Sequence, residues 1–235
     1  MALPFRIAAL VYRAVASVLI ATGIIRVANL FTGAPSWSSF LYFTVLSNVL
    51  CLGWMVWSAI VTARDGASQG WRGFSTPSAR GEGFVMMAIT VTMLIYLIVL
   101  VPYLYEQPGA GAPFSLTDNL VHIVTPLLVV VDWLLFVPKG SFRAIDPVLW
   151  AIIPYLYLAF AFTYGAVGGD FGGGARVPYP FMDVEANGFW GVVAWIAGLT
   201  VALIAFGYVY YGIDRLLARF TPAREAPARG GGGSL

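Results

Sequence analysis

Six apolar stretches, each about twenty residues or longer, dominate this chain and restrict what it can fold into. They cover approximately residues 7–30, 38–62, 84–105, 117–137, 147–167 and 188–212. A bilayer core ~30 Å thick requires about 20 apolar residues of a helix that crosses it. Charged residues make up only 10% of the 235 residues, against about 25% in soluble domains. The sequence therefore predicts an all-α, polytopic membrane protein with six transmembrane helices in one bundle over residues 1–220.

The two ends of the chain differ in composition: the first stretch is apolar and the last is of low complexity. The first apolar stretch contains Arg13 and is not followed by a clear small-residue cleavage site and a soluble domain, so we interpret it as a retained span rather than a signal peptide. Residues 221–235 read "TPAREAPARGGGGSL". This low-complexity composition is typical of a disordered cytoplasmic tail or an added flexible linker.

The distribution of Lys and Arg predicts the orientation of the bundle. Segments on one side of the six spans hold eleven basic residues: Arg6, Arg13, Arg64, Arg72, Arg80, Lys139, Arg143, Arg215, Arg219, Arg224 and Arg229. The other side holds two, Arg26 and Arg176. Because cytoplasmic segments carry an excess of basic residues, both termini are predicted to be cytoplasmic. The basic residues lie in short loops, span ends and tails, so the net charge of +2 does not indicate nucleic-acid binding.

Polar side chains interrupt the second span near its predicted outer end. The stretch "FLYFTVLSNVL" contains Thr44, Ser47 and Asn48, which are three and four residues apart and therefore share one helical face. Hydroxyls in apolar helices often bond to a carbonyl of the preceding turn. Ser, Thr and Asn also hold neighbouring helices together by hydrogen bonds. Spacing alone leaves both structural interpretations open beside a functional one.

The fourth span contains the only histidine, His122, within "SLTDNLVHIVTPLLVVVDWLLF". An ionisable residue inside a membrane span is by default a candidate for function. Asp118 and Asn119 precede it by four and three residues, so either side chain could orient the ring and leave one nitrogen free as a base. Ser115-x-x-Asp118 also matches a capping box, in which Asp118 would serve only the helix start.

Thr44 and His122 are predicted to lie at similar depths. At the helical rise, they lie ~9 Å and ~7.5 Å below the outer ends of their spans. A hydroxyl beside a histidine is the arrangement of a nucleophile and its general base. Asn48 or Ser47, one turn away, could then donate a hydrogen bond to a developing oxyanion.

Other charged and aromatic residues complete the predicted arrangement. We expect Arg26, Arg176, Tyr179 and Asp183 near the same outer face, where they could contact a substrate. Snorkelling of Arg26 to the interface explains its position equally well.

A second charged residue inside a span lies on the opposite, inner half of the bundle. Asp132 is buried in the fourth span and needs a partner, and Arg13 is the candidate. Their pair would be structural or would belong to a proton or ion path.

Three stretches together resemble a known family: "YFTVLSN" opening the second span, "DNLVHIVTPLLVVVDW" in the fourth, and "VPYPFMD" after the fifth. The layout, over roughly residues 5–215, is similar to the androgen-induced and androgen-dependent membrane proteins and their bacterial six-span relatives. The resemblance implies an intramembrane threonine hydrolase of fatty acid esters of hydroxy fatty acids, with Thr44 as nucleophile and His122 as base. The elements "DW" and "YPFMD" point to the bacterial branch, and hence to a bacterial cytoplasmic membrane.

The expected function is therefore hydrolysis of a lipid or fatty-acyl ester at a site toward the outer face. The alternative is a proton-coupled transporter or a membrane small-molecule sensor without hydrolytic activity. With one histidine and one cysteine, the sequence shows no metal-ligand spacing and implies no cofactor. Membrane lipids are the expected surroundings, and the oligomeric state is left open.

Overall fold

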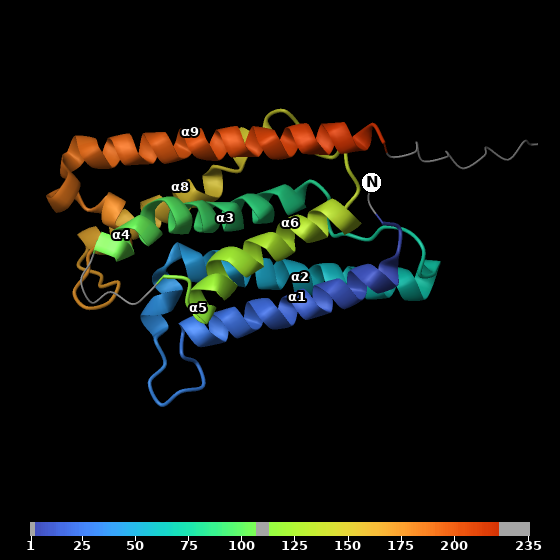
Figure 1. Ribbon diagram of the computed structural model, residues 1–235, viewed down its shortest axis with the longest axis horizontal. Helices are drawn as coiled ribbons and strands as arrows, with labels where there is room; N and C mark the ends of the chain where they lie inside the picture. The colour runs from blue at the N-terminus through green and yellow to red at the C-terminus, as the bar shows by residue number, and fades with distance from the viewer. Residues whose placement is uncertain (1–2, 107–112, 221–235) are drawn as a thin grey trace, which may run out of the picture.

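The computed structural model describes residues 3–106 and 113–220 and is all-α, as the sequence predicts. Six helical segments are long and apolar enough to cross a membrane. They lie roughly along one common direction in a single bundle (Figure 1), which makes the chain a polytopic membrane protein. The predicted tail, residues 221–235, lies outside the described residues.

Three spans are single helices and three are built from shorter pieces. The single helices are α1 (Arg6–Val27), α2 (Phe43–Gln69) and α9 (Val184–Ala218), the last with a kink at Gly188 near its start. The third span joins α3 (Gly81–Ile95), the π-helical turn η2 (Tyr96–Leu100) and α4 (Val101–Glu106). The fourth joins α5 (Leu116–Asn119), the π-helical turn η3 (Leu120–Val124) and α6 (Thr125–Phe136), and the fifth joins α7 (Asp146–Leu149) and α8 (Ile152–Ala166). Short 3₁₀ helices precede two spans: η1 (Trp37–Leu41) and η4 (Pro180–Met182).

The third span, led by α3, forms the centre of the bundle. In Figure 1, α1 and α2 lie along one flank, α3 and α6 cross the middle, and α9 runs along the opposite flank. Met86, Met87 and Ile89 of α3 are completely buried, whereas α8 and α9 keep most of their apolar side chains on the surface. Such an apolar surface is what lipid tails would cover.

The helix boundaries differ from the sequence prediction most clearly in the second and sixth spans. The second span begins at Phe43 rather than at 38, because residues 37–41 form a 3₁₀ turn and Tyr42 is extended. It continues to Gln69 and ends at Gly70, whose φ of 84° favours glycine. In α9, Gly188 has φ 68° and breaks the helix internally, at the residue where the sixth apolar stretch was predicted to begin.

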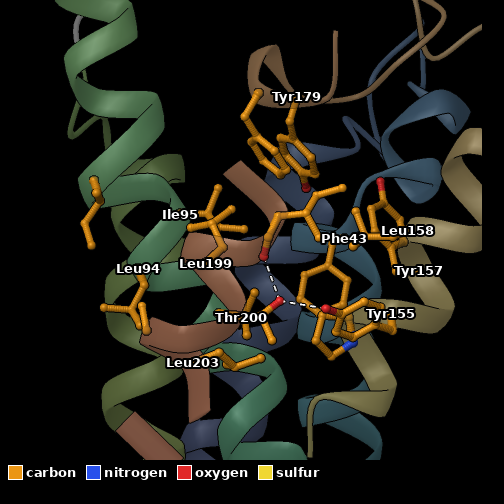
Figure 2. A pocket seen from close by; sticks show the side chains of 16 residues that line it. Phe43, Leu94, Ile95, Tyr155, Tyr157, Leu158, Tyr179, Leu199, Thr200 and Leu203 are labelled. Carbon is orange, nitrogen blue, oxygen red and sulfur yellow. Dashed lines mark hydrogen bonds between the residues drawn. The ribbon is translucent and has the colours of Figure 1, made fainter. Parts of the chain in front are cut away.

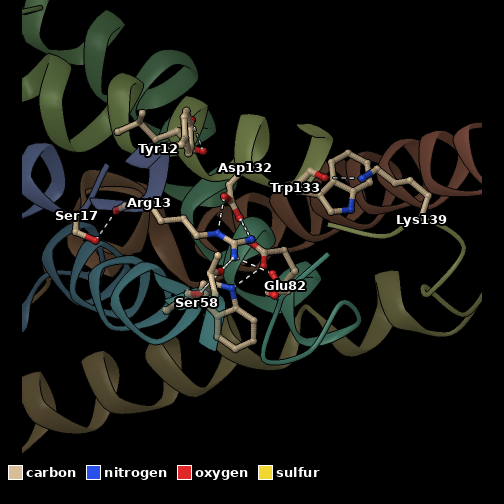
Figure 3. Close-up of polar contacts among 12 residues, drawn as sticks. Tyr12, Arg13, Ser17, Ser58, Glu82, Asp132, Trp133 and Lys139 are labelled. Atoms are coloured by element: carbon tan, nitrogen blue, oxygen red, sulfur yellow. Dashed lines mark hydrogen bonds and ion pairs between the residues drawn. The ribbon is translucent and has the colours of Figure 1, made fainter. Parts of the chain in front are cut away.

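A buried ion pair links α1 to α6 (Figure 3). Arg13 Nε lies 2.8 Å from Asp132 Oδ1 and Arg13 Nη2 lies 3.0 Å from Oδ2, and both side chains are fully buried. The predicted pairing of these two residues is thus confirmed. Arg13 also donates to Thr62 Oγ1 at 2.6 Å and to the carbonyl of Ser75 at 2.8 Å. One guanidinium therefore connects α1, α6, α2 and the segment before α3.

The end of the bundle that is nearer to this pair carries the start of α1 and the last turn of α9. The opposite end carries η1, η4 and the starts of α2 and α5, and is called the site end below.

Candidate active site

Thr44 lies in the first turn of α2, at the site end. Its Oγ1 is 3.3 Å from Nε2 of His122, although the two residues are 78 positions apart in the chain. Thr44 is half-buried and His122 is 8% exposed. The structure thus brings together the two residues that the sequence singled out as candidate nucleophile and base.

The other ring nitrogen of His122 determines which tautomer is present. Nδ1 lies 3.1 Å from the backbone carbonyl oxygen of Asp118, which can only accept a hydrogen bond. Nδ1 therefore carries the proton, and the lone pair of Nε2 faces the hydroxyl of Thr44. A neutral imidazole in this tautomer is poised to take a proton from Thr44.

The side chains expected to orient His122 have other partners. Asp118 forms the capping box with Ser115, whose Oγ lies 2.6 Å from Asp118 Oδ2. The amide of Asn119 donates to the carbonyl of Phe114 at 2.8 Å. The ring is held by a main-chain carbonyl of its own helix, which neither side-chain interpretation anticipated.

The π-helical turn η3 places His122. Its last hydrogen bond runs from the amide of Thr125 to the carbonyl of Leu120, five residues earlier. The next residue, Pro126, has no N–H to give to the carbonyl of Val121. Asn48 Nδ2 donates to that carbonyl at 3.0 Å instead. A proline and an amide from α2 thus maintain the widened turn, a feature that often marks functional sites.

A second π-helical turn faces the first. In η2 the amide of Val101 bonds to the carbonyl of Tyr96, again directly before a proline, Pro102. The ring of Tyr96 stacks on His122 with centroids 4.1 Å apart and planes 8° apart. Its hydroxyl accepts the amide of Phe114 at 2.8 Å. Sequence reasoning missed Tyr96, because an aromatic residue in an apolar span gives no signal of its contact. The only sequence clue was a proline inside each of the two spans, Pro102 and Pro126.

The candidate oxyanion donors predicted on α2 are engaged elsewhere. Asn48 Nδ2 donates to the carbonyls of Thr44 at 2.7 Å and Val121 at 3.0 Å. Ser47 Oγ contacts Thr92 Oγ1 at 2.7 Å and the Thr44 carbonyl at 3.1 Å. In this arrangement the two residues support the backbone at both sides of the Thr44–His122 contact, and neither directs a free donor toward it.

Tyr179 approaches Thr44 from the segment between α8 and α9. Its hydroxyl oxygen lies 3.4 Å from the amide nitrogen of Thr44 and also faces the amide of Phe43 and the hydroxyl of Thr44. These two amides belong to the first turn of α2 and have no acceptor within the helix. The side chain is 6% exposed, and burial raises the pKa of the Tyr179 hydroxyl to about 12. Tyr179 is therefore a neutral phenol at the helix start.

A cleft of about 800 Å³ opens at the site end. His122, Tyr96 and Tyr179 form part of its wall, together with Arg176 and Asp183 from the segment before α9. Of the four residues expected to contact a substrate, three therefore line one cleft. The fourth, Arg26, donates to Thr117 at 3.1 Å and is not one of the described residues that line it.

Tyr179 also lines an apolar cavity of about 80 Å³ (Figure 2). Side chains of α3, α8 and α9 surround it, and Phe43 and Tyr179 also form part of its wall. Its main polar feature is the hydroxyl pair of Tyr155 and Thr200, 2.8 Å apart. Tyr179 is therefore shared between a polar cleft and an apolar cavity.

Within the described residues, no cluster of His, Cys, Asp and Glu has the arrangement of a metal site. In comparisons with protein-family models, with curated proteins and with solved structures, no match to this chain is found.

Proposed function

We propose that this chain is an intramembrane hydrolase of acyl esters, with Thr44 as nucleophile and His122 as general base. The observation that carries the proposal is the 3.3 Å contact between Thr44 Oγ1 and His122 Nε2, with the opposite ring nitrogen bonded to a carbonyl. This is the geometry of a hydroxyl next to an oriented base. A separation slightly longer than an ideal hydrogen bond is common before substrate binds.

The reaction follows from these two groups. Thr44 Oγ1 attacks the ester carbonyl while His122 Nε2 takes its proton. The imidazolium then gives that proton to the leaving alkoxide as the C–O bond breaks, which leaves an acyl group on Thr44. Water attacks this acyl group, His122 takes the water proton, and the carboxylic acid departs with Thr44 restored.

The surroundings favour a lipid ester as substrate. The cleft offers polar side chains for the portion near the ester, and the neighbouring cavity is walled by apolar side chains suited to an acyl chain. Fatty acid esters of hydroxy fatty acids, or a related acyl lipid, are the substrates that the family resemblance suggests. A lipid ester could enter laterally between helices, since the site lies among membrane spans.

The orientation and location belong to the same proposal. The excess of Lys and Arg at the end opposite the site supports a site that faces outward and termini that face the cytoplasm. The resemblance to the bacterial branch supports a bacterial cytoplasmic membrane.

The direct test is covalent labelling of the purified protein in detergent with a fluorophosphonate probe. Wild type, Thr44→Ala and His122→Ala are compared, and mass spectrometry locates the adduct. We expect an adduct on Thr44 in the wild type and none at this position in either variant, because the two residues act as a unit.

Thr90→Ala serves as the matched control, because this buried hydroxyl bonds to the Met86 carbonyl and to Tyr210 rather than to Thr44 or His122. It should label like the wild type. A folded wild type without an adduct, or labelling that persists in His122→Ala, would argue against hydrolysis and for the transporter or sensor.

A further inference from the structure

We propose that Tyr179 is a further catalytic residue of this hydrolase, donating its O–H to the oxyanion that forms when Thr44 attacks the ester. The inference rests on the proposed function and adds a donor that the Thr44–His122 pair does not contain. It follows from the position of one phenol relative to the start of α2.

The position of Tyr179 fits the space where the oxyanion would form. An oxyanion created by attack of Thr44 Oγ1 lies within about 3 Å of that oxygen, and its donors must reach the same point. The Tyr179 hydroxyl faces both the amide and the hydroxyl of Thr44, and lies 3.4 Å from the amide nitrogen. The phenol thus borders the position of the reacting carbonyl oxygen.

The main-chain amide of Thr44 supplies the second donor. It belongs to the first turn of α2, and among the described residues its one hydrogen bond is the long contact to Tyr179. When an oxyanion replaces that acceptor, the amide and the phenol can both donate to it. The negative charge is also favoured at the N-terminus of a long helix.

Tyr179 keeps its proton for this role. Burial raises the pKa of its hydroxyl to about 12, so the phenol remains a donor throughout the neutral and moderately alkaline range. The competing donors on α2 are less suitable, because Asn48 and Ser47 are bonded to backbone carbonyls and to Thr92.

The neighbouring rings hold the phenol in place. Tyr179 stacks on Phe181 with planes 5° apart, and Tyr42 meets it edge-on with centroids 6.1 Å apart. Both contacts involve the ring and not the hydroxyl. Removing the oxygen alone should therefore leave the ring in position, which makes the proposal testable with a single-atom change.

The chemical step balances with groups already described. The bond from Thr44 Oγ1 to the carbonyl carbon forms, the proton of Thr44 moves to His122 Nε2, and the carbonyl π electrons become the oxyanion. That oxyanion accepts hydrogen bonds from Tyr179 O–H and Thr44 N–H, and neither proton is transferred. Collapse of the intermediate expels the alkoxide, which takes the proton from His122.

The test compares wild type with Tyr179→Phe on p-nitrophenyl butyrate in detergent. Loss of one oxyanion donor lowers kcat by roughly 10²–10³-fold. We expect such a fall in kcat, with KM changed far less. Tyr164→Phe is the matched control. The Tyr164 hydroxyl, at the end of α8, donates to the backbone carbonyl of Asp170 and takes no part in the contact with Thr44. Its loss should leave kcat unchanged.

A thionoester analogue of the substrate shows whether Tyr179 donates a hydrogen bond to the oxyanion or only supports the structure. Sulfur accepts hydrogen bonds poorly, so an intact oxyanion site favours the oxygen ester over the thionoester. We expect this preference to shrink in Tyr179→Phe and to persist in Tyr164→Phe. If Tyr179→Phe leaves kcat or the preference for the oxygen ester unchanged, Tyr179 is not an oxyanion donor. Labelling of Thr44 and cleavage of the ester would still support the proposed hydrolase in that case. A wild type that neither labels at Thr44 nor cleaves the ester would remove the proposed function, and this inference with it.

Discussion

Arg13 is a cation inside an apolar helix, and its surroundings compensate its charge fully. The guanidinium bonds both oxygens of Asp132 and also reaches Thr62 and two backbone carbonyls. A buried charge is tolerated only with such partners, because an unpaired one in this environment carries a large desolvation cost. The sequence alone indicates that a cation in an apolar span needs a partner. It also indicates which partner, because Asp132 is a carboxylate at a similar depth in the inner half of the spans.

Removing one member of this pair should destabilise the protein strongly. Asp132→Asn leaves the Arg13 charge uncompensated, which costs about 3–5 kcal/mol in the free energy of unfolding. The expected result is a lower Tm, measured by intrinsic fluorescence during thermal unfolding in detergent. The double variant Arg13→Met/Asp132→Leu should recover most of the loss, because it removes both charges. A double variant as unstable as Asp132→Asn would contradict this account.

At the scale of elements, two interrupted helices form the candidate site. The third and fourth spans each contain a π-helical turn directly before a proline, and the residues they present, Tyr96 and His122, stack on one another. Each proline can be read from the sequence as an interruption of its span, but the apolar stretches themselves give no sign of a π turn. The wider turn arises because Asn48 of α2 takes the carbonyl that Pro126 leaves without a partner.

Pro126→Ala should convert η3 toward a regular α-helical turn. The new N–H can then bond a carbonyl of η3, which rotates His122 away from Thr44. Because misplacement by about 1 Å can cost about 10²-fold in rate, fluorophosphonate labelling of Thr44 should slow by one to two orders of magnitude. The Tm should hold or rise, since a proline inside a helix is unfavourable by ~3 kcal/mol.

Pro138→Ala is the control for this substitution, because Pro138 lies after the end of α6 at the other end of the bundle. Its labelling rate should equal that of the wild type. Equal rates in Pro126→Ala and wild type would show that the π turn does not position His122.

At the scale of the whole molecule, charge is distributed unequally between the two ends of the bundle. The site end holds Arg26 and Arg176, and the other basic residues lie toward the opposite end or in the tail. Since basic segments are retained in the cytoplasm, this asymmetry determines the proposed direction of the cleft.

Single cysteines test the orientation. Ala175→Cys lies in the exposed loop at the site end, and Ala144→Cys lies in the exposed loop between α6 and α7. The native Cys51 is completely buried and serves as the unreactive background. A membrane-impermeant maleimide applied to intact cells should label Ala175→Cys, and should label Ala144→Cys only after permeabilisation. The reverse pattern would invert the proposed orientation.

The sequence by itself determined the fold class, the six spans and the two residues, Thr44 and His122, whose chemistry suits a nucleophile and a base. Length and apolarity are local properties that a bilayer demands of each helix, so they can be read without knowing any neighbour. Only the tertiary structure decided that the two side chains meet, that a main-chain carbonyl sets the tautomer of His122, and that Tyr96 and Tyr179 complete the surroundings. The His122–Asp118 bond lies within one span and depends on where the turn widens, whereas the other contacts join residues distant in the chain and depend on how the helices pack.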